Sequence, residues 1–477
     1  MADIGGETYD AVVVGAGPNG LAAAVELARN GRSVAVLEAE DTIGGGARSA
    51  ELTLPGFVHD TGSAIHPMGL ASPFLRELPL EEHGLEWIQP TAPLAHPFDD
   101  GTAAILERSI EATGDTLGPD AGAYRQLIEP VVGDWDKLSG ALLGPPRPPR
   151  HPLALARFGL KAIRSARGLA ESTFETEKAR GMFAGLAAHS ILPLERGATA
   201  SFGLVFATIG HAVGWPLPKG GAQKITDALA SYLRSLGGEV FTGIRVRSTN
   251  DVPRARAILF DVTPRQLLEI AGEHFTERYR GALSRYRYGP GVFKVDYALD
   301  GPIPWRAEEC SRAGTVHLGG RLDEISAGEA AVWQGKHPER QFVLLAQQSL
   351  FDATRAPEGK HTVWAYCRIP HGSAFDMTER IEAQIGRFAP SFKERILAKS
   401  TMGPAELEKQ NANLVGGDIS GGVADLRQLV ARPALRPDPY STPAKGIYIC
   451  SSSTPPGAGV HGLCGYFAAR SALRQLK

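Results

Sequence analysis

Three glycines near the N-terminus have the spacing of a dinucleotide-binding turn. Gly15, Gly17 and Gly20 form the pattern G-x-G-x-x-G between an apolar run, residues 9–14, and a small apolar stretch, residues 21–29. This order predicts a buried strand, a tight turn and a helix. Glycine lets a pyrophosphate approach the backbone, and the start of the helix offers free N–H groups and a positive dipole. The residues expected to contact the ligand are Gly15, Gly17, Pro18, Asn19 and Gly20.

A carboxylate stands at the end of the second predicted strand. Residues 33–37 are largely apolar, and Glu38 follows them, eighteen residues after Gly20. At that position a carboxylate can accept hydrogen bonds from both hydroxyls of an adenosine ribose, and it would repel a 2′-phosphate. Glu38 and the adjacent Ala39 are therefore predicted to bind an unphosphorylated dinucleotide, either NAD or FAD.

A second glycine-rich segment favours FAD. Gly44, Gly45 and Gly46 follow the second strand, and three consecutive glycines let another backbone segment approach the same ligand, for which an NAD enzyme has no use. The stretch resembles the FAD-dependent phytoene desaturase and flavin amine oxidase superfamily, whose members follow the ribose acid with a GGR-x-x-[ST] segment. Here Gly46 occupies the usual arginine position, which leaves open whether Arg48 takes over the phosphate contact. Gly45, Gly46 and Arg48 are expected cofactor contacts.

The resemblance to this superfamily also covers a middle segment of the chain. We expect residues 239–246 to form a strand, and the part from residue 242 is similar to the superfamily's segment that runs past the adenine. The resemblance implies that Val246 offers its backbone N–H and C=O to the adenine edge.

A glycine-rich loop near the C-terminus repeats the first spacing. Gly457, Gly459 and Gly462 form G-x-G-x-x-G, but the predicted strand, residues 447–450, ends seven residues before the first of them. The fifteen residues after Gly462 are too few for another strand with an acid. We therefore expect a loop whose backbone lies against the flavin ring, where the dipole of the following helix stabilises negative charge on reduced flavin. The expected ring contacts are Gly457, Gly459 and Val460.

Three side chains are candidates for the chemistry. Lys294 interrupts an apolar strand, residues 291–299. In flavin amine oxidases a lysine on a similar strand holds a water beside flavin N5, and the resemblance implies this role; an exposed strand lysine is the alternative. His66 and His461 stand where they could face flavin or substrate, or serve as loop and capping residues. Asp60 is expected to brace a turn.

Composition limits the function classes. The chain has 477 residues, and 50 Lys and Arg against 52 Asp and Glu give no overall field that would favour nucleic acid. Four cysteines lie far apart, which predicts buried thiols in a reducing compartment, and no metal site is expected. The N-terminus lacks a leader pattern, and no run reaches eighteen uncharged apolar residues, so we expect a soluble, cytoplasmic protein.

The predicted fold is α/β and discontinuous. We expect a Rossmann-type FAD-binding domain with a doubly wound parallel sheet, and an inserted α+β substrate domain. The FAD-binding parts are residues 1–72, 215–288 and 426–477; the substrate parts are 73–214, largely helical, and 289–425, a mixed sheet.

The substrate region holds two notable helical stretches. A predicted helix, residues 153–169, carries Arg157, Lys161, Arg164 and Arg167, and could lie on an anionic membrane or present a solvated face. Residues 184–193 and 198–213 are small and apolar with embedded polar side chains, so they could line a channel or pack a helical core. These side chains are His189, Ser190 and His211.

These features together predict an FAD-dependent oxidoreductase of phytoene-dehydrogenase type. It would remove hydride from a saturated C–C bond of an apolar small molecule, and oxygen or a quinone would accept the electrons, since the sequence has no NAD(P)H site. Amine oxidation is the nearest alternative, which Lys294 favours slightly. A non-redox flavin-dependent isomerase and an FAD-binding scaffold protein are further alternatives. The oligomeric state stays open, a homodimer included.

Overall fold

Two sheets organise the protein, whose computed structural model describes residues 8–476. A five-stranded parallel sheet has the order β16-β10-β1-β2-β9. Its strands are β1 (Thr8–Val14), β2 (Val34–Leu37), β9 (Glu239–Phe241), β10 (Arg254–Phe260) and β16 (Ile447–Ile449). The order, with distant segments side by side, confirms the predicted Rossmann-type sheet.

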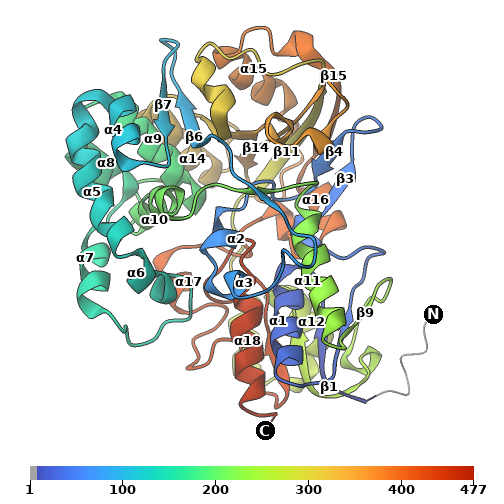
Figure 1. Ribbon diagram of the computed structural model, residues 1–477. Coiled ribbons are helices and arrows are strands. Elements are labelled where there is room, and N and C mark those ends of the chain that lie inside the picture. The colour runs from blue at the N-terminus through green and yellow to red at the C-terminus, as the bar shows by residue number, and fades with distance from the viewer. Residues whose placement is uncertain (1–7, 477) are drawn as a thin grey trace.

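Helices cover both faces of the parallel sheet. Ala11 and Val13 of β1 pack into one apolar core with α1 (Pro18–Arg29), α11 (Gln223–Ser235) and α18 (Leu463–Leu473). The alternate residues Val12 and Val14 pack with α12 (Pro264–Ala271) and α13 (Glu277–Ser284) on the opposite face. Because successive side chains of a strand point to opposite faces, a continuous apolar strand needs both layers. Figure 1 shows α1 and α18 side by side, although they come from opposite ends of the chain.

The second sheet is mixed and has seven strands in the order β15-β11-β14-β13-β12-β6-β7. They are β6 (Ala92–Pro97), β7 (Ala103–Leu106), β11 (Gly291–Leu299), β12 (Ala313–Leu318), β13 (Val343–Ala346), β14 (His361–Ile369) and β15 (Ile396–Met402). Two of them, β6 and β7, come from the stretch for which the sequence predicted helices. Pro93 and Pro97 weaken the sequence pattern of a strand in β6, although β6 pairs in parallel with β12.

A layer of helices packs against one face of the mixed sheet, at the left of Figure 1. Its helices are α4 (Ile110–Leu117), α5 (Ala121–Gly133), α6 (Trp135–Leu142), α7 (Pro152–Ala162), α8 (Ala166–Thr173), α9 (Glu177–Ala187) and α10 (Thr199–Ala212). The prediction of one basic helix over residues 153–169 was wrong. Ser165 accepts a hydrogen bond from the Gly168 N–H at 3.2 Å and so begins a new helix, α8.

The remaining elements lie between or beside these layers. The helices are α2 (Pro67–Ala71), α3 (Pro73–Arg76), α14 (Leu322–Trp333), α15 (Thr378–Phe388), α16 (Pro404–Gln410) and α17 (Leu426–Val430). The strands are β3 (Ser49–Glu51), β4 (Val58–Asp60), β5 (Trp87–Ile88) and β8 (Leu217–Pro218). The expected strand over residues 239–246 ends at Phe241, because Gly243 turns the chain with a φ of 71°. Val246 therefore lies in a loop.

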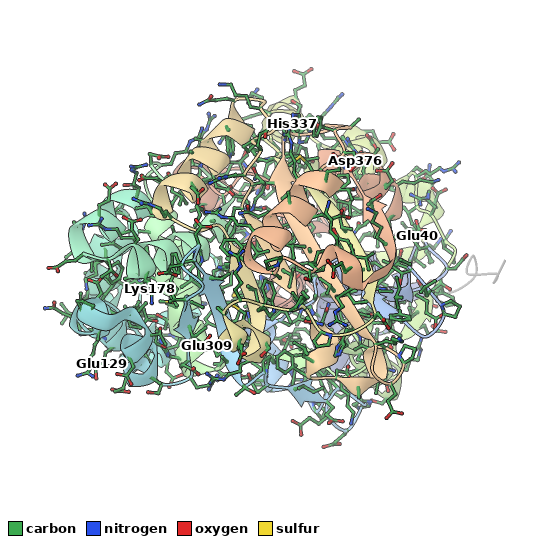
Figure 2. All side chains as sticks on the ribbon, turned by 90° about the horizontal axis from the view of Figure 1, so that it is seen from above. Glu40, Glu129, Lys178, Glu309, His337 and Asp376 are labelled. Atoms are coloured by element: carbon green, nitrogen blue, oxygen red, sulfur yellow. The ribbon has the colours of Figure 1, made fainter. Side chains whose placement is uncertain are left out.

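Charged side chains surround the molecule, as Figure 2 shows for Glu129, Lys178 and Glu309. All four cysteines are buried and free, as the sequence predicted. Within residues 8–476, no helix has the length and apolar character that crossing a bilayer requires.

Candidate cofactor and substrate site

A cavity of about 670 Å³ connects the two sheets. Its wall begins at the carboxyl ends of β1, β2 and β10, where open α/β sheets bind ligands, and reaches the face of β11, β14 and β13. Of the site residues predicted from the sequence, Gly20 and Gly457 are outside this wall. Those in the wall are Gly15, Gly17, Pro18, Asn19, Glu38, Ala39, Gly45, Gly46, Arg48, His66, Val246, Lys294, Gly459, Val460 and His461.

The first glycine turn is built for a close approach. Gly15 has a φ of 105°, and a Cβ on Gly20 would overlap the carbonyl oxygen of Gly15. Gly20 therefore lets helix α1 pack against the turn. Gly17 begins α1 without a side-chain cap, and the cavity wall includes Gly17, Pro18 and Asn19. This end of the helix can face an anion such as a pyrophosphate.

Glu38 is buried at the end of β2, with 7% of its surface exposed. Its carboxylate accepts hydrogen bonds from the N–H groups of Ala16, at 2.8 Å, and Glu40, at 3.0 Å. The Arg48 guanidinium donates to Glu38 at 3.4 Å and to the Thr42 carbonyl oxygen at 2.8 Å. Arg48 thus braces the acid and its loop, which fixes the carboxylate where a ribose would lie.

The second glycine segment meets the first. A Cβ on Gly45 would lie 3.1 Å from the Cα of Gly17, so only glycines let these backbones lie so close. A Cβ on Gly46 would project into open space in the cavity wall. A side chain there would fill the volume beside the turn. The two segments therefore form a cradle that fits a dinucleotide.

Asp261 is a site residue that the sequence analysis missed. It follows β10 as Glu38 follows β2, its carboxylate accepts a hydrogen bond from the Gly20 N–H at 2.9 Å, and it lines the cavity. Burial, with the Glu38 charge as a smaller cause, raises the pKa of Asp261 to about 7. The missed signal was its position at the carboxyl end of a strand next to β1.

Lys294 is buried, with 3% of its surface exposed, which excludes the exposed-lysine alternative. It lines the cavity and forms an ion pair with Asp296 on the same face of β11. Burial lowers the pKa of Lys294 and raises that of Asp296 to about 6. Asp296 was missed, although two residues along a strand share a face.

His66 and His461 are buried in the cavity wall, and the Nε2 atom of each lacks a hydrogen-bond partner within the described residues. The Nδ1 atom of His461 accepts a hydrogen bond from the Leu463 N–H at 3.0 Å, so this ring also caps the start of α18. Burial lowers the pKa of both imidazoles to about 4, so both rings are neutral at pH values near 7.

Asp60 has the bracing role that the sequence predicted. The Arg355 guanidinium donates to its carboxylate at 2.7 Å, and the Ala222 N–H donates at 2.8 Å. All of these groups are buried, so Asp60, the last residue of β4, connects this strand to the start of α11.

The parallel sheet and its glycine cradle form a fold and a site that fit a dinucleotide. A model of the flavin containing amine oxidoreductase family matches residues 19–267, which is just over half of the chain. The protein belongs to this family and is an FAD-dependent oxidoreductase.

Similar proteins span nearly the whole chain. Pyridine nucleotide-disulfide oxidoreductase domain-containing protein 2 of Mus musculus is 26% identical, over 98% of this chain and 94% of its own length. A phytoene desaturase (neurosporene-forming) of Rhodobacter capsulatus is 25% identical, over 95% and 92%.

Solved structures share the fold. An oxidoreductase from Methanosarcina mazei has a TM-score of 0.64 at 16% identity and covers 98% of this chain and 100% of its own. Putrescine oxidase, wild type bound to putrescine, has a TM-score of 0.62 at 21% identity and covers 98% of each chain.

Proposed function

We propose that the protein converts a saturated C–C bond of an apolar small molecule into a double bond, by removal of a hydride from one carbon and of a proton from the next. When bound, FAD supplies the hydride acceptor at its N5 atom. The proposal rests mainly on which charged and apolar residues form the cavity wall. Of the residues described, its acidic members are Glu38, Glu40 and Asp261, which all belong to the nucleotide end. The rest of the wall is mainly apolar and aromatic, so it suits an uncharged hydrocarbon better than an ammonium ion.

The chain's own residues have separate tasks in this proposal. The two glycine segments and Glu38 hold the nucleotide, and the loop with Gly459 and Val460 lies against the ring. Lys294, paired with Asp296, lies in the cavity wall, where its ammonium group would stabilise the negative charge of reduced flavin. The neutral ring of His66 can accept the proton that the substrate loses with the hydride, and His461, whose Nδ1 atom already accepts from the Leu463 N–H, can donate from its Nε2 atom to the bound flavin.

The whole-chain relative that is a phytoene desaturase supports C–C oxidation. We also propose oxygen or a quinone as the electron acceptor. The domain bounds remain those expected from the sequence, residues 1–72, 215–288 and 426–477 for FAD and the intervening parts for the substrate.

Amine oxidation is the second candidate. The buried Lys294 favours it. The cavity wall also holds an aromatic pair, Trp364 and Tyr366, with ring centroids 5.0 Å apart. This pair does not favour amine oxidation, because its rings meet edge to face at 71°, whereas two rings that sandwich an amine would be parallel. A non-redox isomerase or an FAD-binding scaffold has no observation in its favour here.

Peripheral membrane contact is part of the proposal for a cytoplasmic protein. Phe158 of α7 and Leu429 of α17 line the cavity, while other side chains of these two helices face outward. Ile163 and Leu426 both adjoin Gly197, so the two elements are neighbours. Exposed apolar side chains beside a cavity support uptake of a lipid-soluble substrate. They are Leu153, Leu160, Ile163, Leu426 and Val430.

Anaerobic mixing of the FAD-loaded protein with candidate polyenes, lipids and amines tests the proposal. Bleaching of the oxidised flavin by an apolar substrate, with a product that has lost two hydrogen atoms from adjacent carbons, is the expected result. Bleaching by amines alone would favour C–N oxidation. An isomerised product with the flavin still oxidised would refute hydride removal.

A further inference from the structure

One row of paired residues crosses the mixed sheet from Lys294 to a histidine cluster. Lys294 of β11 pairs with Tyr366 of β14, Tyr366 with Leu344 of β13, and Leu344 with His317 of β12. Paired residues share a sheet face, and Lys294, Tyr366 and Leu344 line the cavity. Three strand spacings separate Lys294 from His317, which is about 14 Å.

His189 lies beneath the far end of this row. It belongs to a 3-10 turn, Ala188–Ser190, that follows α9, and its Nε2 atom lies 3.1 Å from the Nε2 atom of His317. Its ring packs on Phe206 with centroids 4.5 Å apart, and both rings line the cavity. His189 is partly exposed, and because burial and the nearby Arg368 lower its pKa to about 3, the imidazole is neutral.

The hydrogen bonds of these rings leave one nitrogen of His189 without a partner. The Nε2 atoms of His189 and His317 share one hydrogen bond, in which one ring donates and the other accepts. Within residues 8–476 the Nδ1 atom of His189 makes no hydrogen bond. Because the His189 ring is neutral, this Nδ1 atom either donates or accepts, in the opposite sense to the Nε2 atom of the same ring.

Ser190, the next residue, adds an unsatisfied hydroxyl to the same cavity wall. Its side chain is 2% exposed and lines the cavity, and its Oγ atom has no hydrogen-bond partner within residues 8–476. A buried hydroxyl without a partner is costly unless a ligand satisfies it. The unpartnered nitrogen of His189 and the hydroxyl of Ser190 therefore match a group that both donates and accepts.

We infer that His189 and Ser190 bind a hydroxyl group of the substrate, about three strand spacings from the bond that is oxidised. This inference rests on the proposed function for the position of the reacting bond, and it narrows the substrate class. The substrate is an apolar chain or ring system with an alcohol at the end far from Lys294. Arg368 does not attract an anion to this end, because it forms a buried ion pair with Glu329 at 3.1 Å.

Equilibrium dialysis with two labelled probes tests the inference on the FAD-loaded protein. The probes are lauryl alcohol and dodecane, which differ by one hydroxyl group. We expect the wild type to bind the alcohol about three- to tenfold more tightly, the range of a net hydrogen bond. S190A and H189F should bring the ratio close to one, and H189N, which keeps a polar group near the Nδ1 position, should recover part of it.

T208V is the matched control for S190A. The Thr208 hydroxyl is also buried and unpartnered, but it is outside the cavity wall, so this change should leave the ratio as in the wild type. Equal binding of both probes by the wild type, or a ratio that survives both H189F and S190A, would overturn the inference. If H189F does not fold, S190A decides, since the Ser190 hydroxyl makes no hydrogen bond whose loss could unfold the described chain.

Flavin reduction is a separate readout. A protein that oxidises its substrate but binds both probes equally refutes the hydroxyl site alone. A protein that discriminates the probes but leaves the flavin oxidised with every substrate class refutes the hydride transfer alone.

Discussion

Asp261 offers a quantitative test of the nucleotide site. Its pKa of about 7 in the folded protein exceeds the ordinary 3.8 by about three units, which corresponds to roughly 4 kcal/mol at 1.36 kcal/mol per unit. Because the folded-state pKa is raised, the stability that Asp261 contributes is full below about pH 4 and is lost as the pH rises towards 7. The loss levels off above pH 7.

D261N is the matched change, because asparagine keeps an oxygen that can accept the Gly20 N–H but carries no charge. As the pH rises from about 5 to about 8, the wild type should lose roughly 3 kcal/mol of unfolding free energy that D261N keeps. Thermal unfolding of the FAD-loaded proteins, followed by flavin release, reports this change as a difference in Tm that opens with pH.

FAD affinity gives a second readout of the same group. A pyrophosphate beside Asp261 would raise its pKa further, so FAD should bind more weakly to the wild type as the pH rises above about 7. The FAD affinity of the wild type should fall at most tenfold per pH unit, and D261N should not show this fall. Identical pH profiles of Tm and of FAD affinity for the two proteins would refute this account of Asp261.

Three further changes test other parts of the site. K294M should slow flavin reduction by substrate at least tenfold, with unchanged FAD content, because it removes the ammonium group that would stabilise negative charge on reduced flavin; an unchanged rate would exclude a catalytic role. G46V should weaken FAD binding at least tenfold by filling the cradle, whereas G122V, also in open space but outside the cavity, should not. L160E should weaken binding to anionic phosphatidylglycerol vesicles about fivefold, since Leu160 is 76% exposed. L236E, at an exposed leucine just after α11, is its control, and equal losses would refute a localised contact.

Local sequence patterns predicted the nucleotide end of the site. The first two strands, the glycine turn and Glu38 all lie within residues 8–38, so their spacing along the chain predicts their relation. Asp261 could not be found this way, because it reaches Gly20 through the pairing of β10 with β1, and 241 residues separate the two in sequence.

The substrate end was less predictable. Proline in β6 weakened the strand pattern, and the break at Ser165 interrupted a helical period that continued on either side. The row from Lys294 to His317 depends on the register of three strand pairs that sequence spacing does not encode.

A crystal structure of the protein with FAD bound tests the central claim most directly. The account predicts the adenosine at Glu38, the pyrophosphate over Gly15 and Gly17, and the isoalloxazine ring between Lys294 and the loop with Gly459. A ring that lies outside this cavity, or an adenosine at the His189 end, would contradict it.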